Sequence, residues 1–173
     1  MQVLIVVDMQ RDFIEGALGT KEAQAILPRV KQRIQSFSGK VLFTQDTHTP
    51  QYLRTQEGQA LPVPHCIQGT PGWMLHPVLE ALCQQPPIQK PTFGSVTLGE
   101  TLLALHQQQP IERITLIGLC TDICVISNAL LLKAFLPEVP IAVDASCCAG
   151  VTPQSHQQAL SAMEACQIIV ENR

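Results

Sequence analysis

The chain has 173 residues, of which 46% are hydrophobic and 14% charged, with a formal net charge of −3. This length fits one domain with one core, which we expect to span residues 1–173. The slight negative charge and the lack of any Lys/Arg-rich run speak against a nucleic-acid partner.

The N-terminal stretch MQVLIVVDMQ has no basic segment, and Asp8 interrupts its apolar run. The run is far shorter than the ~20 apolar residues of a membrane span, so we expect no membrane partner and a cytoplasmic protein. The number of cysteines, seven, is odd, and the sequence shows no export signal. Both observations predict reduced thiols rather than disulfides. Cys83 and Cys166 fall within apolar patterns and are expected to be buried.

Apolar runs alternate with segments of helical periodicity. In chain order, we expect a strand at 3–8, a helix at 22–37, a strand at 40–46, helices at 74–83 and 98–108, a strand at 113–119, a helix at 121–135, a strand at 140–145, a helix at 153–165 and a strand at 167–170. The polar stretch 46–73 is long enough to be functional. Strands without polar alternation between helices predict a three-layer α/β/α sandwich with a mainly parallel, doubly wound sheet.

Ligands of such sheets bind beyond the carboxyl ends of the strands. Asp8, Asp46 and Cys120 each come where an expected strand ends. Cys124 lies one turn into the following helix, where the helix N-terminus favours a thiolate. Taken singly, each residue also has an ordinary interpretation: a turn cap for Asp8, a core cysteine for Cys124 and a surface lysine for Lys90.

The spacing of Cys120 and Cys124 narrows their chemistry. Thioredoxin-like redox motifs are C-x-x-C, whereas these two cysteines are separated by three residues. A four-cysteine metal site would need a second pair at suitable spacing, and the sequence has none. The spacing therefore speaks against a redox pair and a four-cysteine metal site, and it leaves open a nucleophile with a neighbour or a core cysteine.

The segments VVDMQRDF, DTH, KPTF and GLCTDICV, in this order and spacing, resemble the cysteine-hydrolase family of nicotinamidases and isochorismatases. The resemblance extends to DASCCAGVTPQSHQQAL and so covers nearly the whole chain. It implies a catalytic triad of Asp8, Lys90 and the nucleophile Cys124. It also implies a cis bond between Leu119 and Cys120, and an oxyanion hole formed by the backbone N–H groups of Cys120 and Cys124. A carboxylate beside a thiol can accept its proton and later deliver it to a leaving amine.

The segment 46–66 contains two histidines and two carboxylates, a donor set that suits a divalent ion with open positions. Each residue alone would be an ordinary loop residue. The resemblance assigns Asp46, His48 and His65 to the metal of nicotinamidases, with Glu57 as a fourth ligand found in some members. We expect zinc, with manganese or iron as alternatives.

The substrate pocket is expected to have the apolar walls Phe13, Trp73 and Phe93. Two positions depart from the family pattern. Pro62 stands where nicotinamidases commonly have an aromatic residue, and Phe93 stands where a tyrosine is frequent. These departures do not affect the expected metal ligands, but they bear on which substrate ring the pocket accepts.

The leading functional prediction is a metal-containing amidohydrolase that converts nicotinamide and water into nicotinate and ammonia through a thioester at Cys124. One alternative is a metal-independent relative acting on a carbamoyl amide or on isochorismate. Another alternative is a protein that has this fold but no enzymatic activity and serves only for binding or assembly. The expected partner is a small-molecule amide, and the resemblance also implies a homo-oligomer.

Overall fold

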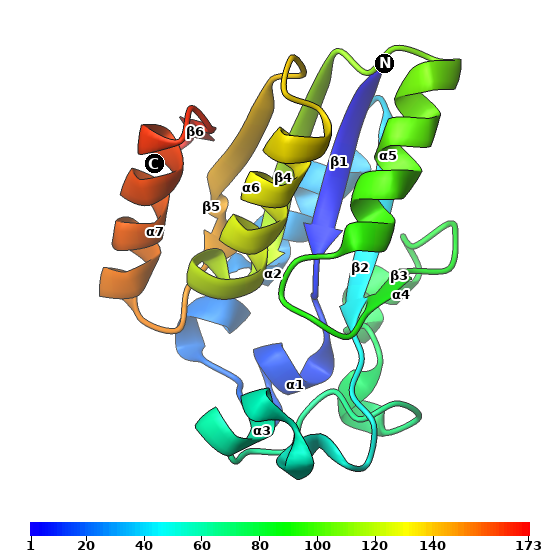
Figure 1. Cartoon of the computed structure of the whole chain (residues 1–173). Helices are drawn as coiled ribbons and strands as arrows, with labels where there is room; N and C mark the ends of the chain where they lie inside the picture. The colour runs from blue at the N-terminus through cyan, green and yellow to red at the C-terminus, as the bar shows by residue number, and fades with distance from the viewer.

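The N-terminal apolar run forms the strand at the centre of the sheet (Figure 1). The structure, a computed structural model describing residues 1–173, has six strands in the order β3-β2-β1-β4-β5-β6, and all neighbours are parallel. The strands are β1 (Gln2–Val7), β2 (Lys40–Asp46), β3 (Ile88–Lys90), β4 (Arg113–Leu119), β5 (Ile141–Ala149) and β6 (Ile169–Glu171). This order reverses direction between β1 and β4, where doubly wound sheets leave a ligand crevice.

Helices cover both faces of this sheet, which gives the three-layer α/β/α sandwich predicted from the sequence (Figure 1). The helices are α1 (Arg11–Ile14), α2 (Lys21–Gln35), α3 (Gln56–Ala60), α4 (Pro77–Glu80), α5 (Val96–Gln108), α6 (Ile126–Phe135) and α7 (Pro153–Ala165). Short 3₁₀ turns at Tyr52–Arg54 and Pro71–Trp73 and a π-helical turn at Thr121–Val125 complete the chain. No helix combines the length and apolarity that crossing a membrane requires.

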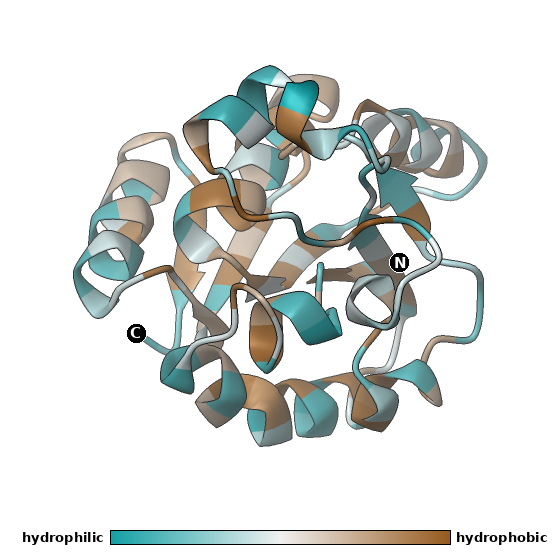
Figure 2. Cartoon of the chain, turned by 90° about the horizontal axis from the view of Figure 1, so that it is seen from below, coloured by the Kyte–Doolittle hydropathy of each residue, from teal (hydrophilic) through white to brown (hydrophobic).

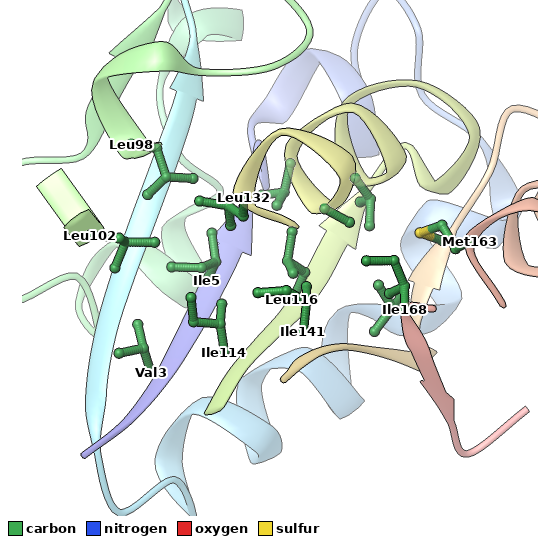
Figure 3. Close-up of a cluster of buried hydrophobic side chains, with 14 of the residues drawn as sticks. Val3, Ile5, Leu98, Leu102, Ile114, Leu116, Leu132, Ile141, Met163 and Ile168 are labelled. Carbon is green, nitrogen blue, oxygen red and sulfur yellow. The ribbon is translucent and has the colours of Figure 1, made fainter. Parts of the chain in front are cut away.

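Two hydrophobic cores lie on opposite faces of the sheet because successive strand residues point to opposite sides. Val3 and Ile5 of β1 point into the core beneath α5, α6 and α7, part of which is drawn in Figure 3. Leu4 and Val6 point into the other core, which α2 covers. In the hydropathy colouring of Figure 2, brown segments gather in the central strands and teal segments are frequent on the peripheral helices.

The structure differs from the sequence prediction at several places. The strand β3 was not predicted, because its three residues lie between proline-containing stretches. The strand predicted at 140–145 extends to Ala149.

Cys166 is exposed and Cys83 is half-buried, so the prediction that both are buried is wrong. Cys166 caps the end of α7 beyond its last buried residue, Met163. All seven cysteines are free thiols.

Candidate active site

The predicted catalytic residues meet at the carboxyl ends of the strands, toward α1 and α3 in Figure 1. Asp8 directly follows β1, and Lys90 is the last residue of β3. The parallel register places Lys90 beside Asp46, which ends β2. Cys124 comes from the π-helical turn that follows β4. Four neighbouring strands therefore bring together residues that are far apart in the sequence.

Lys90 lies at the centre of this cluster and is fully buried. Its Nζ atom is 2.6 Å from Asp8 Oδ2 and 3.1 Å from Asp46 Oδ1. The same ammonium donates to Cys124 Sγ at 3.4 Å and to the Thr92 carbonyl at 3.2 Å. The interpretation of Lys90 as a surface lysine is therefore wrong, since a buried ammonium needs such partners.

Asp8 is held in place by its backbone conformation and by the neighbouring strand. Its φ is +48°, in the left-handed region that aspartate tolerates better than most residues. Thr44 of β2 donates its hydroxyl to Asp8 Oδ1 at 2.7 Å and accepts from the Asp8 N–H at 3.3 Å. Oδ1 is therefore occupied, and Oδ2 is the oxygen directed at Lys90.

Burial and the charges in the site oppose ionisation of the Cys124 thiol. Burial raises the pKa of Cys124 well above its usual value, the Asp8 carboxylate raises it further, and Lys90 only partly opposes them. Burial also raises the pKa of Asp8, against the effect of Lys90. The sequence had suggested a thiolate favoured by the helix N-terminus. Two buried carboxylates already face one ammonium, so a thiolate would be a further uncompensated anion.

The predicted metal ligands lie next to this charge cluster and share Asp46 with it. Ligand atoms of Asp46, His48 and His65 all lie within 4.8 Å of one another. The Asp46 Oδ2 atom is 2.9 Å from His48 Nε2 and 3.7 Å from His65 Nε2. Glu57 Oε1 is 3.4 Å from His48 Nε2 and 3.7 Å from His65 Nε2. The two oxygens of Asp46 thus face different groups, Lys90 on one side and the imidazoles on the other.

The donor atoms of this cluster fit a divalent metal ion. His65 Nδ1 lies 2.8 Å from the Val63 carbonyl, which can only accept, so the proton sits on Nδ1 and the lone pair of Nε2 faces the cluster. His48 Nε2 also faces the cluster, 2.9 Å from Asp46 Oδ2 and 3.4 Å from Glu57 Oε1. Two imidazole nitrogens and a carboxylate oxygen that converge in this way form a ligand set typical of zinc and related ions.

A cavity of about 630 Å³ opens onto both clusters. Hydrophobic side chains account for 11 of its 18 lining residues. Phe13 and Phe93 are among them, as predicted for pocket walls, and Phe93 is 44% exposed. Cys124, Asp46, Glu57 and His65 also line this cavity, so the predicted nucleophile and three of the four predicted metal ligands face one space.

The prediction that Trp73 walls the pocket is wrong for this cavity, because Trp73 is not among its lining residues. The indole Nε1 donates to Thr47 Oγ1 at 2.9 Å. The Trp73 carbonyl accepts from the side-chain amides of Gln10 and Gln45, each at 2.8 Å. These bonds hold Trp73 beside a second, smaller hollow that Gln45 also lines.

Cys120 occupies the position expected of a neighbour to the nucleophile. The Leu119–Cys120 peptide bond is cis, as the resemblance implies. Cys120 and Cys124 both line the cavity. Burial raises the pKa of the Cys120 thiol to about 12, so this side chain stays protonated at neutral pH.

Three buried polar residues that support the site were not singled out from the sequence. The Gln10 amide pairs with the main chain of Asp46, accepting from its N–H at 2.8 Å and donating to its carbonyl at 2.9 Å. Thr44 holds Asp8, and Asn128 of α6 donates to the Cys124 carbonyl at 2.8 Å. Thr44 and Asn128 are polar residues within or next to an apolar run, which is the signal that the sequence offers for them.

Comparison with known proteins agrees with this geometry. The family described as the isochorismatase domain matches residues 2–172. A nicotinamidase/pyrazinamidase of Mycobacterium tuberculosis is 27% identical over 143 residues, which cover 75% of this chain and 77% of that protein. The nicotinamidase structure from Bacillus subtilis superposes with a TM-score of 0.82 at 27% identity and covers 99% of both chains. A Pyrococcus horikoshii pyrazinamidase in complex with zinc gives a TM-score of 0.77 at 27% identity, covering 98% of this chain and 97% of that one. This chain belongs to the isochorismatase family.

Proposed function

We propose that the protein is a metal-containing cysteine amidohydrolase that converts nicotinamide and water into nicotinate and ammonia. One observation carries the proposal: Asp46 joins the Lys90–Asp8–Cys124 cluster to the two-histidine cluster at the edge of a single apolar cavity. The similar proteins described as nicotinamidases and pyrazinamidases support a hydrolase that acts on an amide bond.

The metal ion would be held by Asp46, His48 and His65, with Glu57 close enough to contribute a fourth ligand. Zinc fits this donor set, and manganese or iron are the alternatives. Such an ion, when bound, supplies a Lewis acid that polarises the substrate. The protein orients the ring between apolar walls that include Phe13 and Phe93.

The covalent steps use the triad. Cys124 transfers its proton to Asp8 as its sulfur attacks the carboxamide carbon, while the backbone N–H groups of Cys120 and Cys124 stabilise the oxyanion. Asp8 then gives the proton to the leaving nitrogen, which departs as ammonia and leaves a thioester. Asp8 next takes a proton from water as that water attacks the thioester. It returns this proton to the departing Cys124 sulfur, which releases the acid and restores both the thiol and the Asp8 carboxylate. Lys90 offsets the negative charge on Asp8 and on the sulfur throughout.

The cavity wall favours a neutral amide over an anionic substrate. Its lining includes the carboxylates Asp46 and Glu57 but no lysine or arginine. An anionic substrate such as isochorismate would therefore lack a basic side chain in the cavity wall to pair with. The two-histidine cluster in turn favours the metal-containing reaction over a metal-independent carbamoyl-amide hydrolase.

Ammonia release from a panel of primary amides, with and without a chelator, tests this proposal. We expect nicotinamide to be hydrolysed, the chelator to inhibit, and the purified protein to contain one metal ion that His48→Ala loses. A fully active metal-free enzyme, or a preference for carbamoyl amides or isochorismate, would favour the metal-independent alternative. If the metal-loaded protein turns over neither the amides nor isochorismate, the protein uses its fold only for binding.

A further inference from the structure

Asn128 is a fully buried residue of α6 whose side-chain amide bonds to three different residues. Its Nδ2 donates to the Cys124 carbonyl at 2.8 Å and to the Phe93 carbonyl at 3.1 Å. Its Oδ1 accepts from the Ser95 N–H at 2.9 Å. One side chain thus joins the residue of the nucleophile to the segment that precedes α5.

That segment, residues 91–95, also contacts the catalytic lysine. The Thr92 carbonyl accepts from Lys90 Nζ at 3.2 Å. The segment passes close to α6, because a Cβ atom placed on Gly94 would lie 3.3 Å from the Ser127 carbonyl oxygen. The backbone that contacts Lys90 is therefore packed against the helix that contains Asn128.

These contacts close a ring around the reacting sulfur. Lys90 touches both Thr92 and Cys124, and Asn128 touches both Phe93 and Cys124. The Lys90–Cys124 contact is 3.4 Å long. A shift of this segment by a few tenths of an ångström would change the field that the ammonium exerts on the thiol.

Asparagine needs a specific reason to occupy this position. It is a poor residue for a helix interior, and its polar atoms would be costly to bury without partners. Aspartate has no donors for the two carbonyls, and leucine has no polar atoms. Threonine can bond to the carbonyl four residues back in its own helix but has no second donor for Phe93.

We propose that Asn128 is a positioning residue that sets the separation between the Lys90 ammonium and the Cys124 thiol. The inference rests on the proposed function for the choice of reaction, nicotinamide hydrolysis, but not for the contacts of Asn128. Asn128 does not contact the substrate or the reacting atoms. It acts by holding the 91–95 segment against α6.

The test compares Asn128→Leu and Asn128→Thr with Leu132→Ala in the full-length, metal-loaded protein. Leu132 lies one turn further along α6, fully buried in the core shown in Figure 3. We measure kcat and KM for nicotinamide, together with the rate at which iodoacetamide alkylates Cys124 at fixed pH, followed by peptide mapping. Both Asn128 variants should lose about 10- to 100-fold in kcat, as small misplacements do, with a much smaller change in KM.

Alkylation of Cys124 should also slow in both Asn128 variants, because the cation that favours the thiolate is displaced. Leu132→Ala should lower the melting temperature and keep the alkylation rate. Asn128→Thr keeps one hydrogen bond and decides the question if Asn128→Leu does not fold. An Asn128→Thr protein with the parent kcat and alkylation rate would overturn the inference, as would losses no larger than those of Leu132→Ala. Alkylation requires no substrate, so this readout stands even if nicotinamide is not hydrolysed.

Discussion

The two halves of the site are built by different parts of the chain, although they share Asp46. The half around Lys90 is formed mainly at strand ends, where Asp8 and Lys90 are fully buried. The half around His48 and His65 lies on the irregular connection between β2 and β3, which is held by the isolated bridge between His48 and Ile67. The sheet therefore fixes the residues of the proposed covalent chemistry, whereas the proposed metal ligands His48, Glu57 and His65 lie on a connecting segment.

The largest expected effect comes from the nucleophile. Cys124→Ala should abolish amide hydrolysis, because it removes the thiol that contacts Lys90 and would form the thioester. Cys120→Ala is the matched control and should retain most activity, since its proposed contribution comes from the backbone and its thiol stays protonated. Steady-state ammonia release measures both. Equal loss in the two variants would point to a dithiol mechanism.

Removing the base should have the next largest effect. Asp8→Asn keeps the size of the side chain and an oxygen that can accept from the Thr44 hydroxyl, but it removes the proton acceptor. Activity should fall by at least ~10²-fold, the lower end of what a general base contributes. Circular dichroism should show that the variant folds. Unchanged turnover would mean that Asp8 is only a structural residue at the strand end.

Separating the two halves is a sharper test of the comparison. His65→Ala removes one imidazole and lies outside the Lys90 cluster, so metal content and nicotinamide turnover should fall together. Alkylation of Cys124 in the metal-free parent and in this variant should proceed at similar rates, because Lys90, Asp8 and Cys124 remain in contact. If His65→Ala slows alkylation relative to the metal-free parent, the two halves do not act independently.

The sequence predicted the site better where its residues follow long strands. Asp8 and Asp46 end apolar runs of recognisable length, so their place at the sheet edge could be read directly. Lys90 ends a strand of only three residues, which periodicity cannot detect. Its role came from the family resemblance alone. The position of Trp73 depends on hydrogen bonds to Thr47, Gln10 and Gln45, which no local pattern encodes.

The protonation of the Cys124 thiol could also not be predicted from the local sequence pattern. The helix start near Cys124 suggested a thiolate, whereas burial and the Asp8 carboxylate together raise its pKa. These effects depend on residues brought together from different strands. A thiol that loses its proton only as Asp8 accepts it should react slowly with iodoacetamide at neutral pH.

The smallest expected effect is on the pH dependence of stability, through Asp8. Burial raises the pKa of Asp8 in the folded protein above about 4, the value of an unperturbed aspartate. The folded state therefore holds this proton to a higher pH than the unfolded state does. The stability that Asp8 contributes is fully present below pH ~4 and is lost as the pH rises through the raised pKa.

The pKa of Asp46 shifts in the opposite direction, because burial, which would raise it, is outweighed by His48 and Lys90. Its contribution is present above pH ~4 and is lost as the pH falls, so the two aspartates partly cancel in the parent protein. The difference between the parent and Asp8→Asn reports on Asp8 together with its interactions with Lys90 and Asp46. Urea unfolding of both proteins from pH 4 to 7 should show the parent losing stability relative to the variant as the pH rises. A constant difference would mean that Asp8 titrates alike in the folded and unfolded states, and that the buried ammonium fully compensates it.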